Sequence, residues 1–186
     1  MDDTYKTWLA AAGWTLVYEE PRTGCFTYDL SDRRIAIRAV IDALPDEFIF
    51  VDDAEVGTQI FREALLFMFE EENQIAGFAR RARPYSEFTT TRGSAAFIRT
   101  CTAALIAWAE NINLDQELKK VADRADGYRA GQHIAALAVL KRTAILEKYL
   151  EDRLAGKPDI LVPAIKNDHI SRAIEFSSRV NKTEAE

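Results

Sequence analysis

The spacing of hydrophobic residues along this 186-residue chain is strand-like in residues 15–51 and helical before and after them. A short amphipathic helix is predicted over residues 3–12, where apolar side chains recur at helical spacing until Gly13 stops it. Four strand-like runs follow, at residues 15–20, 25–30, 33–42 and 47–51. Their alternation and their short connections predict an antiparallel sheet with one covered face.

The most apolar segment, residues 57–83, comes directly after these runs. Its first half is apolar on nearly every side: Ile60, Phe61, Ala64, Leu65, Leu66, Phe67, Met68 and Phe69. A helix of this kind is buried between two neighbours. Thr58 suits its N-cap, and Pro84 suits an end near Arg80–Arg83. We therefore predict a central helix between the sheet and a helical layer, with a basic end exposed to solvent.

The remaining residues have helical periodicity. Ser94 and Asn113 are predicted to cap two successive helices. A long helix is predicted over residues 129–154, where Gly156 follows as a stop, and a last helix over residues 164–180.

The fold class that results is α+β: an N-terminal helix and a four-stranded antiparallel sheet packed by a central helix, followed by a helical C-terminal layer. We expect a sheet-containing half at residues 1–83, a loop at residues 84–93 and a helical half at residues 94–180. The two halves are expected to share one core, and residues 181–186 are expected to form a disordered tail.

This order of elements resembles the secretion-chaperone-like α/β modules of bacteria. The residues that carry the resemblance are 5–13, 15–51 and 58–80. The resemblance implies a protein that dimerises and binds an extended segment of a partner protein.

Composition narrows the class of protein. An apolar fraction of 48% and a charged fraction of 29% are typical of a soluble globular chain, and no apolar run reaches the length of a membrane span. Asp2 and Asp3 are unlike the basic start of a signal peptide. Cys25 and Cys101 give neither a disulfide framework nor a metal-ligand spacing. We therefore expect a cytoplasmic protein without a membrane partner.

The net charge of −6 is concentrated in the first part of the chain, since residues 1–56 carry 12 acidic and 5 basic side chains. This acidity argues against nonspecific nucleic-acid binding there. It favours solubility, or a basic surface on a partner.

A basic stretch with interleaved aromatic residues is the candidate partner-binding site: Arg80, Arg81, Arg83, Tyr85, Phe88 and Arg92. Together with Arg99 it could bind an acidic peptide, phosphate or nucleic acid. We favour the simpler interpretation that its arginines offset the negative end of the central helix. The stretch is also small for nucleic-acid binding.

Candidate pocket residues are few: Tyr28, Arg38, His133 and His169. The two histidines have no metal-ligand spacing, and a helix-packing role is the simpler interpretation for both. The acidic cluster at residues 70–72 fits a solvated face, and the cluster at residues 52–55 fits either a solvated face or an interaction with the positive end of the central helix dipole. No phosphate loop, nucleophile elbow or CxxC pair is present, so no catalytic residue, metal or cofactor is predicted.

We therefore predict a non-enzymatic protein-binding module: an adaptor, a secretion-chaperone-like protein or an inhibitor or immunity-type partner that could also form a homodimer. An exposed sheet face or edge strand is the expected binding surface. One alternative is an enzyme or small-molecule binder with a pocket between sheet and helical layer. A second is nucleic-acid binding through residues 80–99.

Overall fold

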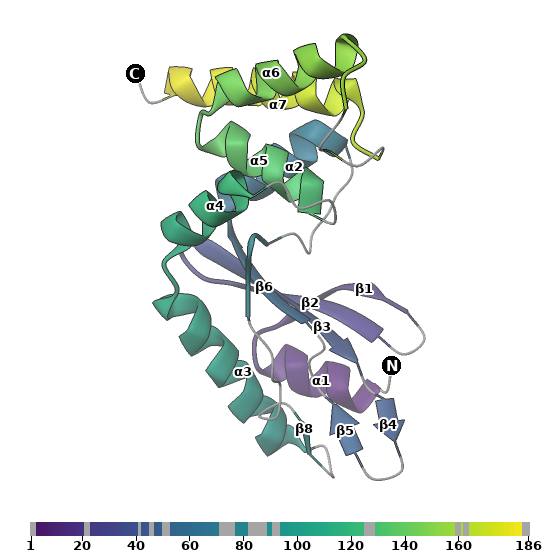
Figure 1. Ribbon diagram of the computed structural model, residues 1–186. Helices are drawn as coiled ribbons and strands as arrows, with labels where there is room; N and C mark the ends of the chain where they lie inside the picture. Colours follow the sequence, from purple (N-terminus) through teal and green to yellow (C-terminus); the bar gives the residue numbers. More distant parts are fainter. Residues whose placement is uncertain are drawn as a thin grey trace. The chain divides into compact units, whose positions relative to one another are not determined.

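The computed structural model describes residues 3–20, 23–40, 42–44, 47–49, 53–70, 77–81, 89–90, 94–124, 129–158, 161 and 164–183. It is an α+β protein with an N-terminal helix, a five-stranded antiparallel sheet and a helical C-terminal part, which confirms the predicted fold class (Figure 1). The chain forms two compact units. The sheet unit comprises Met1–Thr58 and Gln74–Ile112, and the helical unit comprises Gln59–Asn73 and Asn113–Glu186.

The main sheet of the sheet unit has the strand order β1-β2-β3-β6-β7, and every neighbouring pair is antiparallel. Its strands are β1 (Thr15–Glu19), β2 (Thr23–Asp29), β3 (Arg33–Val40), β6 (Asp53–Thr58) and β7 (Ala79–Arg80). A smaller sheet contains β4 (Asp42–Leu44), β5 (Glu47–Ile49) and β8 (Thr89–Thr90). The first three predicted strands thus lie in the main sheet, whereas the fourth predicted run forms β5 of the smaller sheet.

The fourth position of the main sheet belongs to β6, whose acidic residues were not predicted to lie in a strand. Asp53 and Glu55 alternate with Ala54 and Val56, and both of these small apolar residues are completely buried. The segment is therefore a strand with one apolar and one charged face. The sequence signal was weak because only two apolar residues mark it.

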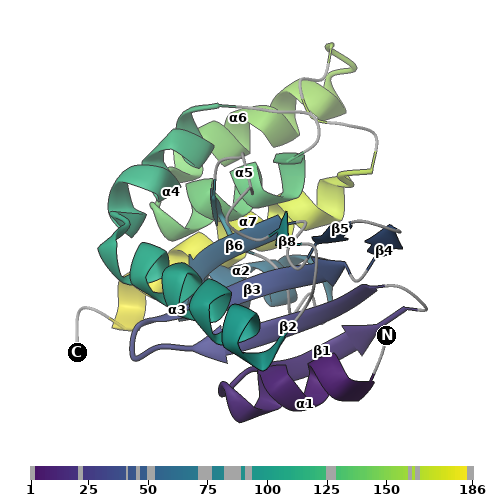
Figure 2. The same cartoon turned by 90° about the horizontal axis from the view of Figure 1, so that it is seen from below.

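One face of the main sheet is apolar and is covered by α1 (Asp3–Ala11) and α3 (Ala95–Asn111), as Figure 2 shows. The register places Phe26, Ile37 and Ala54 side by side on this face, and all three are buried. The next residues along the strands point the other way, which brings Cys25, Arg38 and Asp53 together on the opposite face. The sheet therefore has one apolar face and one polar face.

Glycine ends two helices where it was predicted to do so. Gly13, with φ 87, follows α1, and the N–H of Trp14 donates to the carbonyl of Leu9 at 3.0 Å. Gly156, with φ 70, follows α6 (Thr143–Leu154) in the same way. This is the Schellman arrangement, which needs a left-handed residue that glycine supplies without steric cost.

The helical unit is built from α2 (Gln59–Phe69), α4 (Leu114–Asp123), α5 (Ala130–Val139), α6 and α7 (Asn167–Thr183). In Figure 1, α6 and α7 lie side by side, and α7 also packs on α2 and α5. The core of the unit consists of fully buried apolar side chains: Phe61, Met68, Ile134, Leu137, Leu146 and Ile170. The predicted caps of α3 and α4 are confirmed, because Ser94 and Asn113 each accept a hydrogen bond from the backbone of the first turn.

The central helix is shorter than predicted. It begins at Gln59, next to the predicted cap Thr58, but ends at Phe69 instead of near Arg80–Arg83. Ala79 and Arg80 form strand β7 because Ala79 is buried beside Val56 while Arg80 forms an ion pair on the polar face. The helical periodicity of this segment could not reveal that Ala79 and Arg80 pair with β6, a strand far from them in the sequence.

The predicted long helix over residues 129–154 is wrong: it is two helices, α5 and α6, with a break at Lys141. Lys141 has φ 58, a left-handed conformation that costs a non-glycine residue about 1–2 kcal/mol. The last helix has the predicted length but lies three residues further along the chain, because α7 begins at Asn167 and continues to Thr183 through the first part of the expected disordered tail. The end of that tail, residues 184–186, lies outside the described residues.

Arg33 of β3 forms hydrogen bonds with the C-terminal end of α3. Its Nη1 donates to the carbonyl of Ala109 at 2.7 Å and to that of Ile112 at 3.3 Å. Its Nε and Nη2 donate to the carboxylate of Asp32 at 2.8 Å and 2.7 Å. A cation at this place satisfies carbonyls that have no partner within the helix and interacts favourably with the helix dipole.

We expect Arg33→Ala to lower the free energy of unfolding of the sheet unit by about 2 kcal/mol, because two partly buried carbonyls lose a charged donor. Urea unfolding followed by tryptophan fluorescence measures this change. The neighbouring Arg34 provides a matched control, since it pairs with the exposed carboxylate of Asp29. Arg34→Ala should cost less than about 1 kcal/mol. Equal losses in the two variants would contradict the role given to Arg33.

Candidate functional site

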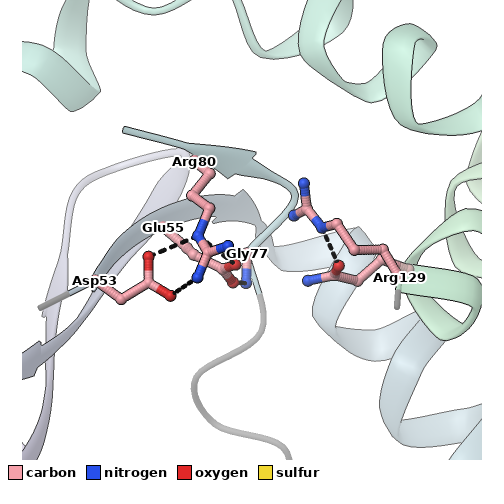
Figure 3. A network of polar contacts seen from close by, with 6 residues as sticks. Asp53, Glu55, Gly77, Arg80 and Arg129 are labelled. Atoms are coloured by element: carbon pink, nitrogen blue, oxygen red, sulfur yellow. Dashed lines mark hydrogen bonds and ion pairs between the residues drawn. The ribbon is translucent and has the colours of Figure 1, made fainter. Parts of the chain in front are cut away.

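A network of charged groups joins β6 to the short edge strand β7 on the polar face of the sheet (Figure 3). Arg80 lies opposite Glu55, and its Nε donates to Oδ1 of Asp53 at 2.7 Å. Oε1 of Glu55 is 4.0 Å from the same nitrogen, while Oε2 of Glu55 accepts the N–H of Gly77 at 3.1 Å. The two carboxylates thus compensate the guanidinium and hold β7 against β6.

This network bears on the basic stretch that was proposed as a partner-binding site. Arg80 is exposed, but its charge is compensated by Asp53. Arg81 is half-buried, and its backbone N–H donates to the carbonyl of Ala54 at 3.0 Å. The other four candidates lie outside the described residues: Arg83, Tyr85, Phe88 and Arg92. A partner surface on the basic stretch therefore stays a prediction.

Two of the four candidate pocket residues, Tyr28 and Arg38, lie in the sheet unit. Tyr28 is half-buried on the apolar side of the sheet, with its ring centroid 5.5 Å from that of Trp14. Arg38 is exposed on the polar side, across from Cys25. Cys25, the partner of Arg38, lies three residues before Tyr28 on β2. Residues an odd number of positions apart on a strand point to opposite faces, so Tyr28 and Arg38 do too. His133 and His169 belong to the helical unit.

Both ring nitrogens of His133 are occupied by hydrogen bonds inside the helical unit. The residue is only 2% exposed, with Nδ1 3.0 Å from the carbonyl oxygen of Val121 and Nε2 3.1 Å from the hydroxyl of Tyr149. Because a carbonyl can only accept, Nδ1 carries the proton and Nε2 accepts the Tyr149 hydroxyl. Burial lowers the pKa of His133 below its ordinary value, which favours this neutral form. The geometry fits a packing role for the ring.

His169 lies in the first turn of α7 and has a different environment. Its Nδ1 accepts the N–H of Lys166 at 3.2 Å, and its ring packs on that of Phe69 with 4.6 Å between centroids. Cys25 and Cys101 are buried and form no disulfide bond. Among the described residues, no group of three or more histidine, cysteine or acidic side chains is arranged to hold a metal ion.

The edge strand β1 carries an exposed surface that the candidate residues from the sequence did not include. It has five residues, and in the described part of the chain it pairs with β2 only. Leu16 is 39% exposed and Tyr18 is 54% exposed. A β-bulge between these two residues turns Leu16 toward the side of Phe26 and Tyr18 toward the side of Cys25. The strand was predicted from its alternation, but its place at the edge depends on the strand order.

The two edges of the main sheet differ in what they offer to another strand. At the opposite edge, β7 has two residues and ends in the charged network of Arg80. Short strands and charges are how natural sheets protect an edge from pairing. The β1 edge is longer and presents large apolar side chains.

Comparison with known proteins gives a family. Within the described residues, no helix has the length and apolar character needed to cross a membrane. No curated protein and no solved structure matches the chain. The model of a family of unknown function (DUF6990) matches residues 3–178, and the chain therefore belongs to this family.

Proposed function

We propose that this protein is a non-enzymatic protein-binding module, and that an extended segment of its partner pairs with β1. The observation that supports the proposal is the exposure of Leu16 and Tyr18 on the longer edge of the sheet. An added strand gains affinity from main-chain hydrogen bonds and specificity from contacts with alternate side chains. The mode needs no catalytic group.

The β-bulge in β1 limits what kind of segment fits. A bulge increases the local twist of an edge strand and interrupts regular pairing. It also places Leu16 and Tyr18 on opposite faces, so that a partner strand can contact one apolar side chain on each side. A short segment with an apolar residue on each face is the ligand that we propose.

The charge of the sheet-bearing region indicates a basic segment. Residues 1–56 carry 12 acidic side chains against 5 basic ones, and Glu20 directly follows β1, whose last residue Glu19 pairs with Lys6. Complementary charge speeds association and discriminates against wrong partners. Binding is therefore expected to weaken as the salt concentration rises.

Selection from a displayed library of random peptides, followed by titration of the selected peptide, tests this function. We expect basic peptides with alternating apolar residues, and we expect Tyr18→Lys to weaken their binding at least about tenfold. Leu154→Lys is the matched control, because Leu154 is 70% exposed but lies on α6 of the helical unit. Its affinity should equal that of the unmodified protein.

The affinities of the selected peptides for these variants show whether β1 is the binding surface. Peptides that bind Tyr18→Lys as tightly as the unmodified protein would show that β1 is not the binding edge. A library that yields no binder at low salt would contradict the protein-binding function itself. Self-association through β1 would appear as a dimer that Tyr18→Lys abolishes.

A further inference from the structure

The link between α5 and α6 has a sequence that favours a helix but a conformation that breaks one. It consists of Leu140, Lys141 and Arg142, all strong helix formers, with no glycine or proline among them. Lys141 nevertheless has φ 58. Local preference and observed structure therefore disagree at this point of the chain.

The link has the hydrogen bonds of a Schellman motif with lysine in the place of glycine. The N–H of Lys141 donates to the carbonyl of Ala138 at 3.1 Å, and the N–H of Arg142 donates to that of Leu137 at 2.9 Å. The same pattern ends α6, where Gly156 occupies the left-handed position. A residue that prefers right-handed backbone is thus held in a left-handed turn.

Contacts across the bend hold it in place. His133 on α5 bonds Tyr149 on α6, and Arg142 forms an ion pair with Asp123 of α4. Leu146 of α6 is completely buried. The bend therefore depends on tertiary packing and not on the sequence of the link.

The two helices that follow the link form one packed hairpin. Thr143 and Ser177 join α6 to α7 through their hydroxyl groups, 2.8 Å apart. In turn, α7 packs on α2 and α5 (Figure 1). If the link straightened, the α6–α7 hairpin would move away from α2 and α5 as a unit.

We propose that two copies of this chain exchange their α6–α7 hairpins. In the exchanged dimer, α5 and α6 form one continuous helix, and each hairpin occupies its usual place on α2 and α5 of the other copy. Every contact across the bend forms again between the two copies. The left-handed backbone conformation of Lys141 is lost in both links, because each link becomes part of a continuous helix. The second copy is the partner that fits this surface because it carries the same hairpin.

In a continuous helix, His133 and Tyr149 of one copy lie too far apart to bond each other. His133 and Tyr149 are sixteen residues apart, which corresponds to about 24 Å along a straight helix. Their 3.1 Å hydrogen bond can then form only between the two copies. This exchange is independent of strand pairing at β1, which lies in the other unit.

A matched pair of substitutions tests the exchange. Lys141→Gly and Lys141→Ala both remove the lysine, and they differ in backbone preference: glycine favours the turn, and alanine favours the helix. Each protein is partly unfolded in urea at about millimolar concentration and refolded, and its dimer fraction is measured by size exclusion with light scattering. We expect Lys141→Ala to dimerise at least about a hundredfold more strongly than Lys141→Gly, because each dimer contains two links.

Two outcomes of this measurement would contradict the exchange of hairpins. A dimer that forms equally in both variants would be a surface dimer, and it would overturn the proposal. So would a protein that stays monomeric in both variants after refolding. Circular dichroism before the experiment shows whether both variants fold, since Lys141 is half-buried.

Discussion

Gly77→Ala is expected to lower the free energy of unfolding of the sheet unit by about 3 kcal/mol, the largest loss that we expect from so small a change. A Cβ atom at this position would lie 2.7 Å from Cβ of Glu55 and 2.8 Å from the backbone nitrogen of Val56. Both atoms belong to β6, which is paired on both sides and cannot shift by itself. The clash would also disturb the hydrogen bond from the Gly77 N–H to Glu55.

Urea unfolding followed by tryptophan fluorescence measures this loss, since all three tryptophans lie in the sheet unit: Trp8, Trp14 and Trp108. Gly156→Ala is the control. Gly156 has left-handed backbone, φ 70, but a Cβ there meets nothing within 4 Å. That variant should lose about 1 kcal/mol in the helical unit and leave the fluorescence transition unchanged. A loss below about 1 kcal/mol for Gly77→Ala would show that the two backbones are not held this closely.

Features that depend on a few neighbouring residues were predictable from the sequence. Gly13 and Gly156 end their helices as expected, because the left-handed turn after a helix selects glycine locally. Ser94 and Asn113 cap theirs for a similarly local reason. The alternation in β3 predicted a strand with one covered face, which the structure shows.

Features that depend on distant partners were not predictable. The break at Lys141 has no local signal, because its residues favour a helix and the contacts that bend it are the ion pair of Arg142 with Asp123 of α4 and the hydrogen bond between His133 and Tyr149. Strand β7 follows from pairing between Ala79 and Val56, which are far apart in sequence. The strand order has the same origin, and it alone places Leu16 and Tyr18 at an edge.

The candidate site divides in the same way. Tyr28 and Arg38 were grouped by residue type, but the register points them to opposite faces. The partners of His133 are a carbonyl twelve residues before it and a hydroxyl sixteen residues after it. Neither spacing falls within one turn of a helix, so a sequence pattern could not connect them.

His133→Asn is expected to lower the free energy of unfolding of the helical unit by about 2–3 kcal/mol at pH 8. The asparagine amide can still donate to Val121, but the hydrogen bond from Tyr149 is lost and a cavity replaces part of the ring. The unit contains no tryptophan, so its unfolding in urea is followed by far-ultraviolet circular dichroism. Tyr149→Phe, which removes only the hydroxyl, should cost about 1–2 kcal/mol.

The pH dependence of this difference identifies the neutral ring as its cause. Burial lowers the pKa of His133 in the folded protein, so below about pH 6.5 the unfolded chain binds more protons than the folded one. The stability that His133 contributes is therefore fully present above that pH and decreases as the pH falls toward the lower pKa of the folded state. His133→Asn cannot titrate, so the stability gap between the two proteins should narrow from pH 8 to pH 5.5. Tyr149→Phe keeps the imidazole and should retain the decline. A gap that stays constant on acidification would mean that burial does not lower the pKa of His133, and a gap that widens would mean that the folded protein favours the charged ring.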